Sequence, residues 1–137
     1  MASSVKYSML LIILFGFFLV ISDANFFRPH EAHVQISNDI GPGIELIVHC
    51  KSGDDDLGQQ KLQYQGTWGF RFRPNIWGTT LFYCSFIWQD QLRYFNVFDW
   101  NRDFKQYIEF LYSIVPAHPC KYNVGTNKYD ICYEWNQ

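Results

Sequence analysis

The chain has 137 residues, a formal net charge of −2 at pH 7, and 13 Phe, 9 Tyr and 5 Trp. This length fits one domain, and the absence of a basic stripe argues against nucleic acid or an anionic membrane as a partner. The aromatic content favours β-strands, because flat rings pack well across a pleated surface.

The first 24 residues have the layout of a secretory signal peptide. Lys6 precedes an apolar run from Met9 to Ile21, and small residues follow at Ser22 and Ala24. Such a run is short for a membrane span, which needs roughly 20 apolar residues. We therefore expect residues 1–24 to be removed after Ala24 and residues 25–137 to form the mature, secreted domain.

Alternation of apolar and polar residues predicts a series of short strands along the rest of the chain. The stretch Trp68–Phe72 is the clearest amphipathic strand, whereas Thr80–Ile87 is apolar on both faces and is expected to be central and buried. Frequent turn residues between strands suggest an all-β fold, a small antiparallel sandwich or barrel of about seven or eight strands. The predicted strands cover residues 34–36, 44–50, 61–64, 68–72, 80–87, 93–98, 121–124 and 129–135.

The stretch 101–113 breaks this pattern. Phe104, Tyr107, Ile108 and Leu111 follow the i, i+3, i+4, i+7 spacing of a helix. Asp99 or Asn101 could cap such a helix. We expect either one short helix or a long irregular loop within 101–113.

The four cysteines of an exported chain indicate a disulfide framework. An even number of cysteines predicts two bridges, and three pairings remain open. A zinc site is disfavoured, because no two cysteines have Cys-x-x-Cys spacing and the four histidines lack ligand spacing. The half-cystines are Cys50, Cys84, Cys120 and Cys132.

Five blocks of the sequence resemble the plant self-incompatibility S1 protein family, also called S-protein homologues. The resemblance implies a small secreted β-sandwich with two disulfides. Founding members of the family are stigma ligands of poppy self-incompatibility that bind a pollen membrane receptor, so an extracellular, non-enzymatic ligand is the implied function. The blocks are Cys50–Gly58, Trp68–Asn75, Gly78–Trp88, Phe95–Asp99 and Tyr129–Trp135.

The residues around the first block, Cys50–Gly58, suggest metal binding or catalysis, but structural roles explain them more simply. The consecutive Asp54, Asp55 and Asp56 could bind calcium, but they lack the alternating spacing of an EF-hand and suit a solvated hairpin turn. His49 beside Cys50 suggests a nucleophile and base, yet neighbouring strand residues point to opposite faces and Cys50 should be oxidised. We therefore expect no catalytic residue, metal or cofactor.

Loops are the expected partner surface, because binding residues concentrate there. The first candidate is the acidic turn Asp54, Asp55 and Asp56. The second is the connection that carries Asp99, Trp100, Arg102, Asp103 and Lys105, which mixes charge with an aromatic ring. The expected partner is a membrane receptor protein, which a monomer of this chain binds in the apoplast.

The alternative function is that of an apoplastic carbohydrate-binding or defence protein. Exposed aromatic rings can stack on sugars, although such rings usually form the core.

Overall fold

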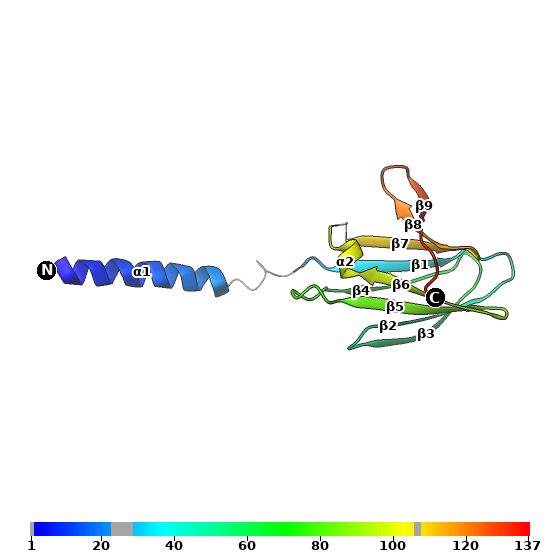
Figure 1. The fold of residues 1–137 in the computed structure, drawn as a ribbon, viewed down its shortest axis with the longest axis horizontal. Coiled ribbons are helices and arrows are strands. Elements are labelled where there is room, and N and C mark those ends of the chain that lie inside the picture. The colour runs from blue at the N-terminus through cyan, green and yellow to red at the C-terminus, as the bar shows by residue number, and fades with distance from the viewer. Residues whose placement is uncertain (1, 23–28, 106–107) are drawn as a thin grey trace.

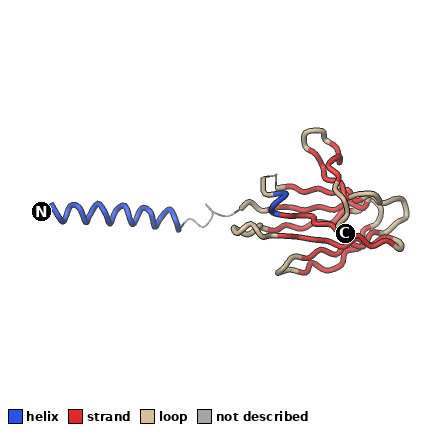
Figure 2. The backbone as a smooth tube through the Cα atoms, in the orientation of Figure 1, coloured by secondary structure: helices blue, strands red, loops and turns tan. Residues whose placement is uncertain are grey.

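The computed structural model describes residues 2–22, 29–105 and 108–137. A helix, α1 (Ala2–Ser22), is followed by a sandwich of two sheets (Figures 1 and 2). The five-stranded sheet has the order β4-β1-β7-β8-β9 and the four-stranded sheet the order β3-β2-β5-β6. The strands are β1 (Ala32–Asn38), β2 (Leu46–Lys51), β3 (Asp56–Leu62), β4 (Thr67–Phe72), β5 (Leu81–Trp88), β6 (Gln91–Asp99), β7 (Glu109–Ile114), β8 (Pro119–Asn123) and β9 (Lys128–Cys132).

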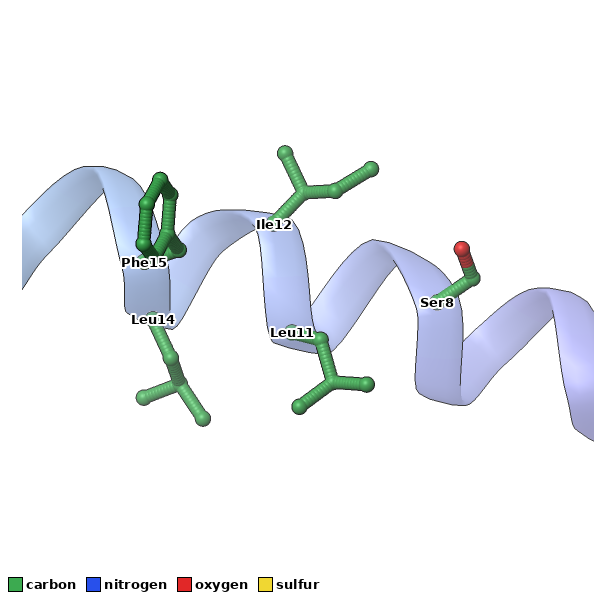
Figure 3. A pocket seen from close by; sticks show the side chains of 5 residues that line it. All are labelled: Ser8, Leu11, Ile12, Leu14 and Phe15. Carbon is green, nitrogen blue, oxygen red and sulfur yellow. The ribbon is translucent and has the colours of Figure 1, made fainter.

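Helix α1 extends away from the sandwich (Figure 1), and its side chains from residue 4 to residue 18 are exposed. A shallow hollow along it is lined only by this helix, by Ser8, Leu11, Ile12, Leu14 and Phe15 (Figure 3). Among the described residues, no helix is both long and apolar enough to cross a membrane. The boundary of the signal peptide at Ala24 remains a prediction.

The core lies between the two sheets. Alternate residues of β1 and β2 are buried, so Val34 and Ile36 from one sheet meet Leu46 and Val48 from the other. Aromatic rings fill one end of the interface, where Phe72 contacts Phe82 and Phe98 at centroid distances of 4.4 and 4.9 Å. This packing confirms the predicted β-sandwich, in which apolar side chains alternate toward the facing sheet.

One strand pair departs from the antiparallel arrangement. β1 and β7 run parallel, with His33 opposite Glu109 and Asn38 opposite Ile114. The described pairs otherwise run antiparallel, so the five-stranded sheet is mixed. A parallel pair forms here because the segment after β6 stays at the end of the sandwich where β1 begins.

Of the two alternatives expected within 101–113, a short helix or an irregular loop, the structure has a short helix at the start of this stretch and a strand in its second half. Helix α2 (Trp100–Asp103) is short, and Asp99 caps it by accepting from the amide of Asn101 at 3.0 Å. The second half is strand β7, in which Phe110, Tyr112 and Ile114 are buried. The helical spacing of Ile108 and Leu111 was thus misleading, since pairing with β1 decides the structure here, and Tyr107 lies outside the described residues.

Other strands differ from expectation in their ends or their burial; the last one, expected at 129–135, is β9 and ends at Cys132. The third strand, expected at 61–64, begins at Asp56 and ends at Leu62, because β2 and β3 pair almost from the acidic turn onward. β5 is central, as predicted, but only one of its faces is buried. Leu81 and Tyr83 are exposed on the other face, which carries no second layer.

Both disulfides join neighbouring strands within one sheet. Cys50 of β2 is bonded to Cys84 of β5, and Cys120 of β8 is bonded to Cys132 of β9. In each case the two cysteines are register partners. The first bridge is fully buried, whereas Cys132 is exposed.

Candidate partner-binding surface

Three connections gather at one end of the sandwich, which we call the loop end. They are the β2–β3 turn (52–55), the β4–β5 loop (73–80) and the segment 99–105. The strand registers place them together, because Lys51 pairs with Tyr83 and Leu81 pairs with Asp99. The loop end is the side from which α1 departs in Figure 1. The fold therefore brings both sequence-predicted loops to the same end of the molecule.

Arg102 and Asp103 hold the segment 99–105 together and are not free surface residues. The Arg102 guanidinium donates from Nε and Nη2 to the two carboxylate oxygens of Asp103, at 2.9 and 2.8 Å. Asp103 is 1% exposed and also accepts from the Asp99 amide at 2.9 Å. The two residues, which the sequence placed among the candidate partner-binding residues, therefore form an ion pair in which Asp103 is buried and Arg102 keeps 25% of its side chain exposed.

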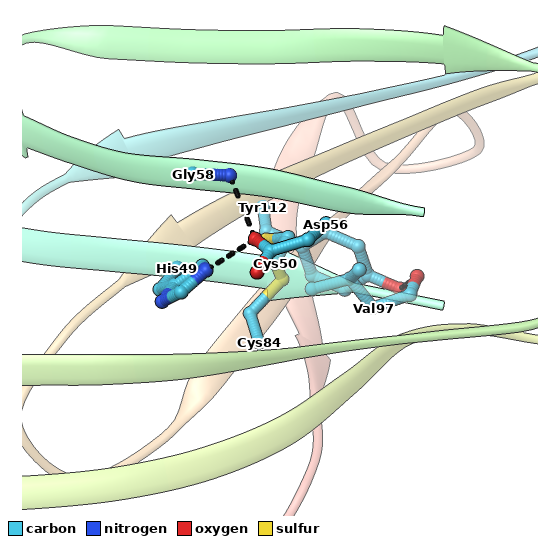
Figure 4. Close-up of a disulfide and its surroundings, with 7 residues drawn as sticks. All are labelled: His49, Cys50, Asp56, Gly58, Cys84, Val97 and Tyr112. Atoms are coloured by element: carbon cyan, nitrogen blue, oxygen red, sulfur yellow. Dashed lines mark hydrogen bonds and ion pairs between the residues drawn. A yellow bond between two sulfur atoms is a disulfide. The ribbon is translucent and has the colours of Figure 1, made fainter. Parts of the chain in front are cut away.

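This pair is built into the aromatic core. The Arg102 guanidinium lies 4.7 Å from the ring centre of Tyr133 and 5.2 Å from that of Phe95. Beside it, Tyr112 donates its hydroxyl to the carbonyl of Val97 at 2.8 Å and so links β7 to the facing sheet. Figure 4 shows Tyr112 and Val97 behind the first disulfide. Burial raises the pKa of Tyr112 far above its ordinary value.

The acidic turn is a solvated hairpin turn tied at its base. Ser52 accepts from the amides of Asp54 and Asp55 through its hydroxyl, at 3.4 and 3.1 Å. Asp56 accepts from the His49 ring and from the Gly58 amide (Figure 4). The His49 hydrogen bond, and then the Gly58 amide, hold the pKa of Asp56 below its ordinary value. Asp54 and Asp55 project into solvent.

Neither catalytic nor metal-binding geometry forms around His49. Its ring lies on the outer face of β2 and is engaged by Asp56, while Cys50 points into the core and is bonded to Cys84. Within the described part of the chain, no group of three or more His, Cys, Asp and Glu side chains could hold a metal ion.

Aromatic rings cover the junction between α2 and the β4–β5 loop. Trp100 stacks on Phe104 at a centroid distance of 5.7 Å, and the Lys105 ammonium lies 5.4 Å from the Phe104 ring. Trp100 also packs against Gly78, whose φ is +73° and where a Cβ would lie 2.5 Å from the Trp100 Nε1. A side chain at this position would both strain the backbone and displace the indole.

The most exposed aromatic ring of the loop end, that of Trp77, was not among the receptor-contact residues predicted from the sequence. Trp77 is 81% exposed and its neighbour Ile76 is 57% exposed, at the tip of the β4–β5 loop. The sequence feature that could have identified Ile76 and Trp77 as surface residues is their position between the turn residues Pro74 and Gly78, outside any alternating strand pattern. Large apolar side chains in such a turn cannot be explained by core packing.

The fold defines a class of small disulfide-bonded β-sandwiches, in which a rigid framework carries surface loops at its ends. The sequence pattern of the family "Plant self-incompatibility protein S1" matches residues 33–135. The chain therefore belongs to the plant self-incompatibility protein S1 family, which confirms the resemblance seen in the sequence.

Curated relatives agree with this membership. S-protein homolog 3 and S-protein homolog 4 of Arabidopsis thaliana are each 42% identical to this chain, and each alignment covers 75% of the chain and 71% of the relative. S-protein homolog 20 of the same plant is 43% identical, with 76% of both proteins covered.

A solved structure has the same fold. It is described as "Structure of SPH (Self-Incompatibility Protein Homologue) proteins, a widespread family of small, highly stable, secreted proteins from plants". The TM-score is 0.58 at 20% identity, and the match covers 80% of this chain and 97% of the solved one. The family to which the chain belongs is thus described as secreted, in agreement with the localisation expected from the sequence.

Proposed function

We propose that the chain is a secreted, non-enzymatic ligand that acts as a monomer and binds a receptor protein at a cell surface through its loop end. The observation that carries this proposal is the exposure of Trp77 and Ile76 beside the Trp100–Phe104 stack. Tryptophan is among the residues that most often dominate the energy of protein interfaces.

The charges around these rings favour a protein partner over a lipid surface. Asp54 and Asp55 project from the β2–β3 turn, while Arg73 and Lys105 are exposed on the other two connections. Apolar groups rimmed by charges of both signs suit a protein interface, where the rim sets specificity and the speed of encounter. Of the residues predicted from sequence, Asp54, Asp55, Trp100 and Lys105 stay in the proposed surface, whereas Arg102 and Asp103 support it from beneath.

Secretion would be directed by residues 1–24, with cleavage after Ala24. The proposal that the mature domain is not an enzyme rests on its cysteines and on His49. All four cysteines are bonded in disulfides, and the His49 ring is engaged by Asp56 on the face opposite Cys50. This arrangement leaves no thiolate beside a base.

Binding of labelled mature protein to living plant cells tests the proposal. We expect saturable binding that protease treatment of the cells abolishes, and we expect Trp77→Ala to weaken it about tenfold or more, as truncation of an interface anchor does. Tyr64→Ala is the matched control, since Tyr64 is an exposed aromatic in the β3–β4 connection at the opposite end.

Two results would contradict the proposal. One is binding by the Trp77→Ala protein that equals binding by the wild type. The other is binding that survives protease but disappears after glycosidase treatment. This second result would support the carbohydrate-binding alternative, for which the exposed Trp77 ring offers a stacking surface.

A further inference from the structure

The five-stranded sheet opens between β7 and β8, and the opening forms a cleft. β8 pairs with β7 only at Tyr112, Ser113 and Ile114, and from there the β8–β9 hairpin rises out of the sheet (Figures 1 and 2). A cavity of about 740 Å³ occupies the space left beside the first half of β7, a volume within the range of roughly 300–1,000 Å³ found for binding pockets. The residues that line this β7–β8 cleft include Lys105, Ile108, Leu111, Tyr122, Val124 and Ile131.

Backbone groups of β7 face this cleft. In a parallel strand pair, alternate residues turn their N–H and C=O groups toward the partner strand. His33 donates its amide to the carbonyl of Ile108 at 2.7 Å, so Ile108, Phe110 and Tyr112 turn toward β1. Glu109 and Leu111 turn the other way. Among the described strands, none pairs with β7 on that side before Tyr112. The Glu109 backbone and the Leu111 amide thus form an open strand edge inside a sheet.

The side chains that line the cleft favour a bound peptide segment with apolar and acidic side chains. Ile108 and Val124 are 51% and 67% exposed and have no core to fill. Lys105 lines the cleft with an exposed side chain, whereas the ammonium of Lys121, a residue that is 4% exposed, lies 5.7 Å from the ring centres of Phe110 and Tyr133. The lining carboxylate of Glu109 contacts the His33 ring at 2.7 Å, so Lys105 is the charge that an acidic side chain of a bound segment would meet.

We propose that the β7–β8 cleft binds an extended peptide segment of a partner protein, which adds a short strand alongside Glu109–Leu111. Its backbone would pair with the open edge of β7, alternate apolar side chains would pack on Ile108 and Val124, and an acidic side chain would meet Lys105. Strand addition of this kind gains affinity from main-chain hydrogen bonds and specificity from alternate side chains. This site shares Lys105 with the loop end, but its other lining residues come from Ile108, β7, β8, β9 and the connection between β8 and β9, and it does not depend on the receptor proposal.

Amide hydrogen exchange of the free mature protein tests whether the strand edge at Glu109 and Leu111 is open. We expect the amides of Glu109 and Leu111 to exchange at least about tenfold faster than those of Phe110 and Tyr112, because exchange follows the loss of a hydrogen-bond partner. Equal protection of the two sets of amides would overturn the proposal, since the strand edge would then be closed.

Titration with a synthetic peptide tests binding. The probe is an acetylated and amidated pentapeptide of alternating valine and glutamate, followed by two-dimensional NMR of the labelled protein. We expect shifts at Glu109, Leu111 and Val124, and slower exchange of the Leu111 amide. The same peptide with lysine in place of glutamate, or with its backbone N-methylated, should bind about tenfold more weakly, a factor that corresponds to losing one charge contact or hydrogen bond. Equal binding of all three peptides, or shifts confined to other surfaces, would overturn the proposal.

Variants separate this site from the loop end. Val124→Asp should weaken binding of the acidic peptide about tenfold, while the protein keeps a well-dispersed spectrum because this side chain is exposed. Trp77→Ala should bind the peptide as the wild type does. Loss of peptide binding in Trp77→Ala, with Val124→Asp unaffected, would assign the peptide to the loop end and overturn the cleft proposal.

Discussion

Asp103 is the residue on which the segment 99–105 depends. Its carboxylate joins the Arg102 guanidinium to the Asp99 amide, and Asp99 in turn caps α2. A carboxylate that is 1% exposed needs a cation and hydrogen bonds in place of the water that it loses on burial. The pair therefore holds the segment 99–105 in place from beneath, and in the proposed receptor surface the exposed neighbours would make the contacts.

Asp103→Ala should destabilise the mature domain by about 3 kcal/mol, at the lower end of the range for breaking a buried ion pair. The lower end applies because Arg102 keeps 25% of its side chain exposed and can regain some water. Urea unfolding measures the change. Asp55→Ala is the control, since Asp55 is exposed and should stay within about 0.5 kcal/mol of the wild type. Equal effects of the two changes would contradict the assigned role of Asp103.

Asp56 makes a contribution to the stability of the folded domain that depends on pH and is lost in acid. The pKa of Asp56 is lowered in the folded state, so its ionised form stabilises the fold above its unfolded pKa. This contribution is lost as the pH falls through the lower folded pKa, in a window below about pH 4. Asp56→Asn should be less stable than the wild type at pH 7, and the difference should vanish as the pH falls through that window. Asp54→Asn should match the wild type throughout; a difference that persists below the window would contradict this account.

At the scale of elements, the two disulfides have different environments and should differ in resistance to reduction. Cys50–Cys84 is buried at the centre of the four-stranded sheet and closes a sequence separation of 34 residues. Cys120–Cys132 joins β8 to the edge strand β9, closes a separation of 12 residues, and has an exposed Cys132. Longer closed loops restrict the unfolded chain more strongly.

Under native conditions, a mild thiol reductant should open Cys120–Cys132 first. Alkylation and mass spectrometry of the products measure the order. Replacing Cys120 and Cys132 by Ala should cost about 3 kcal/mol, and replacing Cys50 and Cys84 about 4 kcal/mol from loop closure, with an added loss of core packing. Faster reduction of the buried bridge would show that exposure does not control the order.

The elements that sequence predicted well are those with clear alternation. Leu46, Val48 and Cys50 of β2 are all buried, as their spacing predicted, and so are the inward residues of β1. β7 was missed because Phe104, Ile108 and Leu111 also fit a helical repeat. Its strand structure comes from pairing with β1, about 75 residues earlier in the chain, an interaction that no local pattern of β7 encodes.

At the scale of the whole molecule, the described side chains of α1 are exposed, and the sandwich holds its own core. A chain that begins at Asn25 should therefore unfold at the same urea concentration as the full-length chain. Protein recovered from the medium of expressing plant cells should begin at Asn25, as mass spectrometry of its N-terminal peptide would report. Recovery of an intact residue 1–24 segment, or a destabilised truncated domain, would contradict the predicted boundary.

The loop end could be anticipated only in part. Asp54, Asp55, Trp100 and Lys105 stood out as polar or aromatic loop residues, and the strand registers bring their two loops to one end. Local sequence could not reveal that Arg102 and Asp103 face inward, because the guanidinium of Arg102 packs against the rings of Phe95 and Tyr133, of which Tyr133 lies far along the chain. Trp77 was recognisable as an aromatic in a turn, but its exposure depends on the three-dimensional position of that turn.

The order of the bridges along the chain has a consequence for oxidative folding. Cys50 bonds to Cys84 and Cys120 bonds to Cys132, so each half-cystine joins its nearest neighbour in sequence and the two covalent rings do not overlap. During vectorial export the first pair emerges, and can oxidise, before either later thiol is available. Pairing in order of emergence thus yields the native connectivity directly, without a thiol–disulfide exchange step.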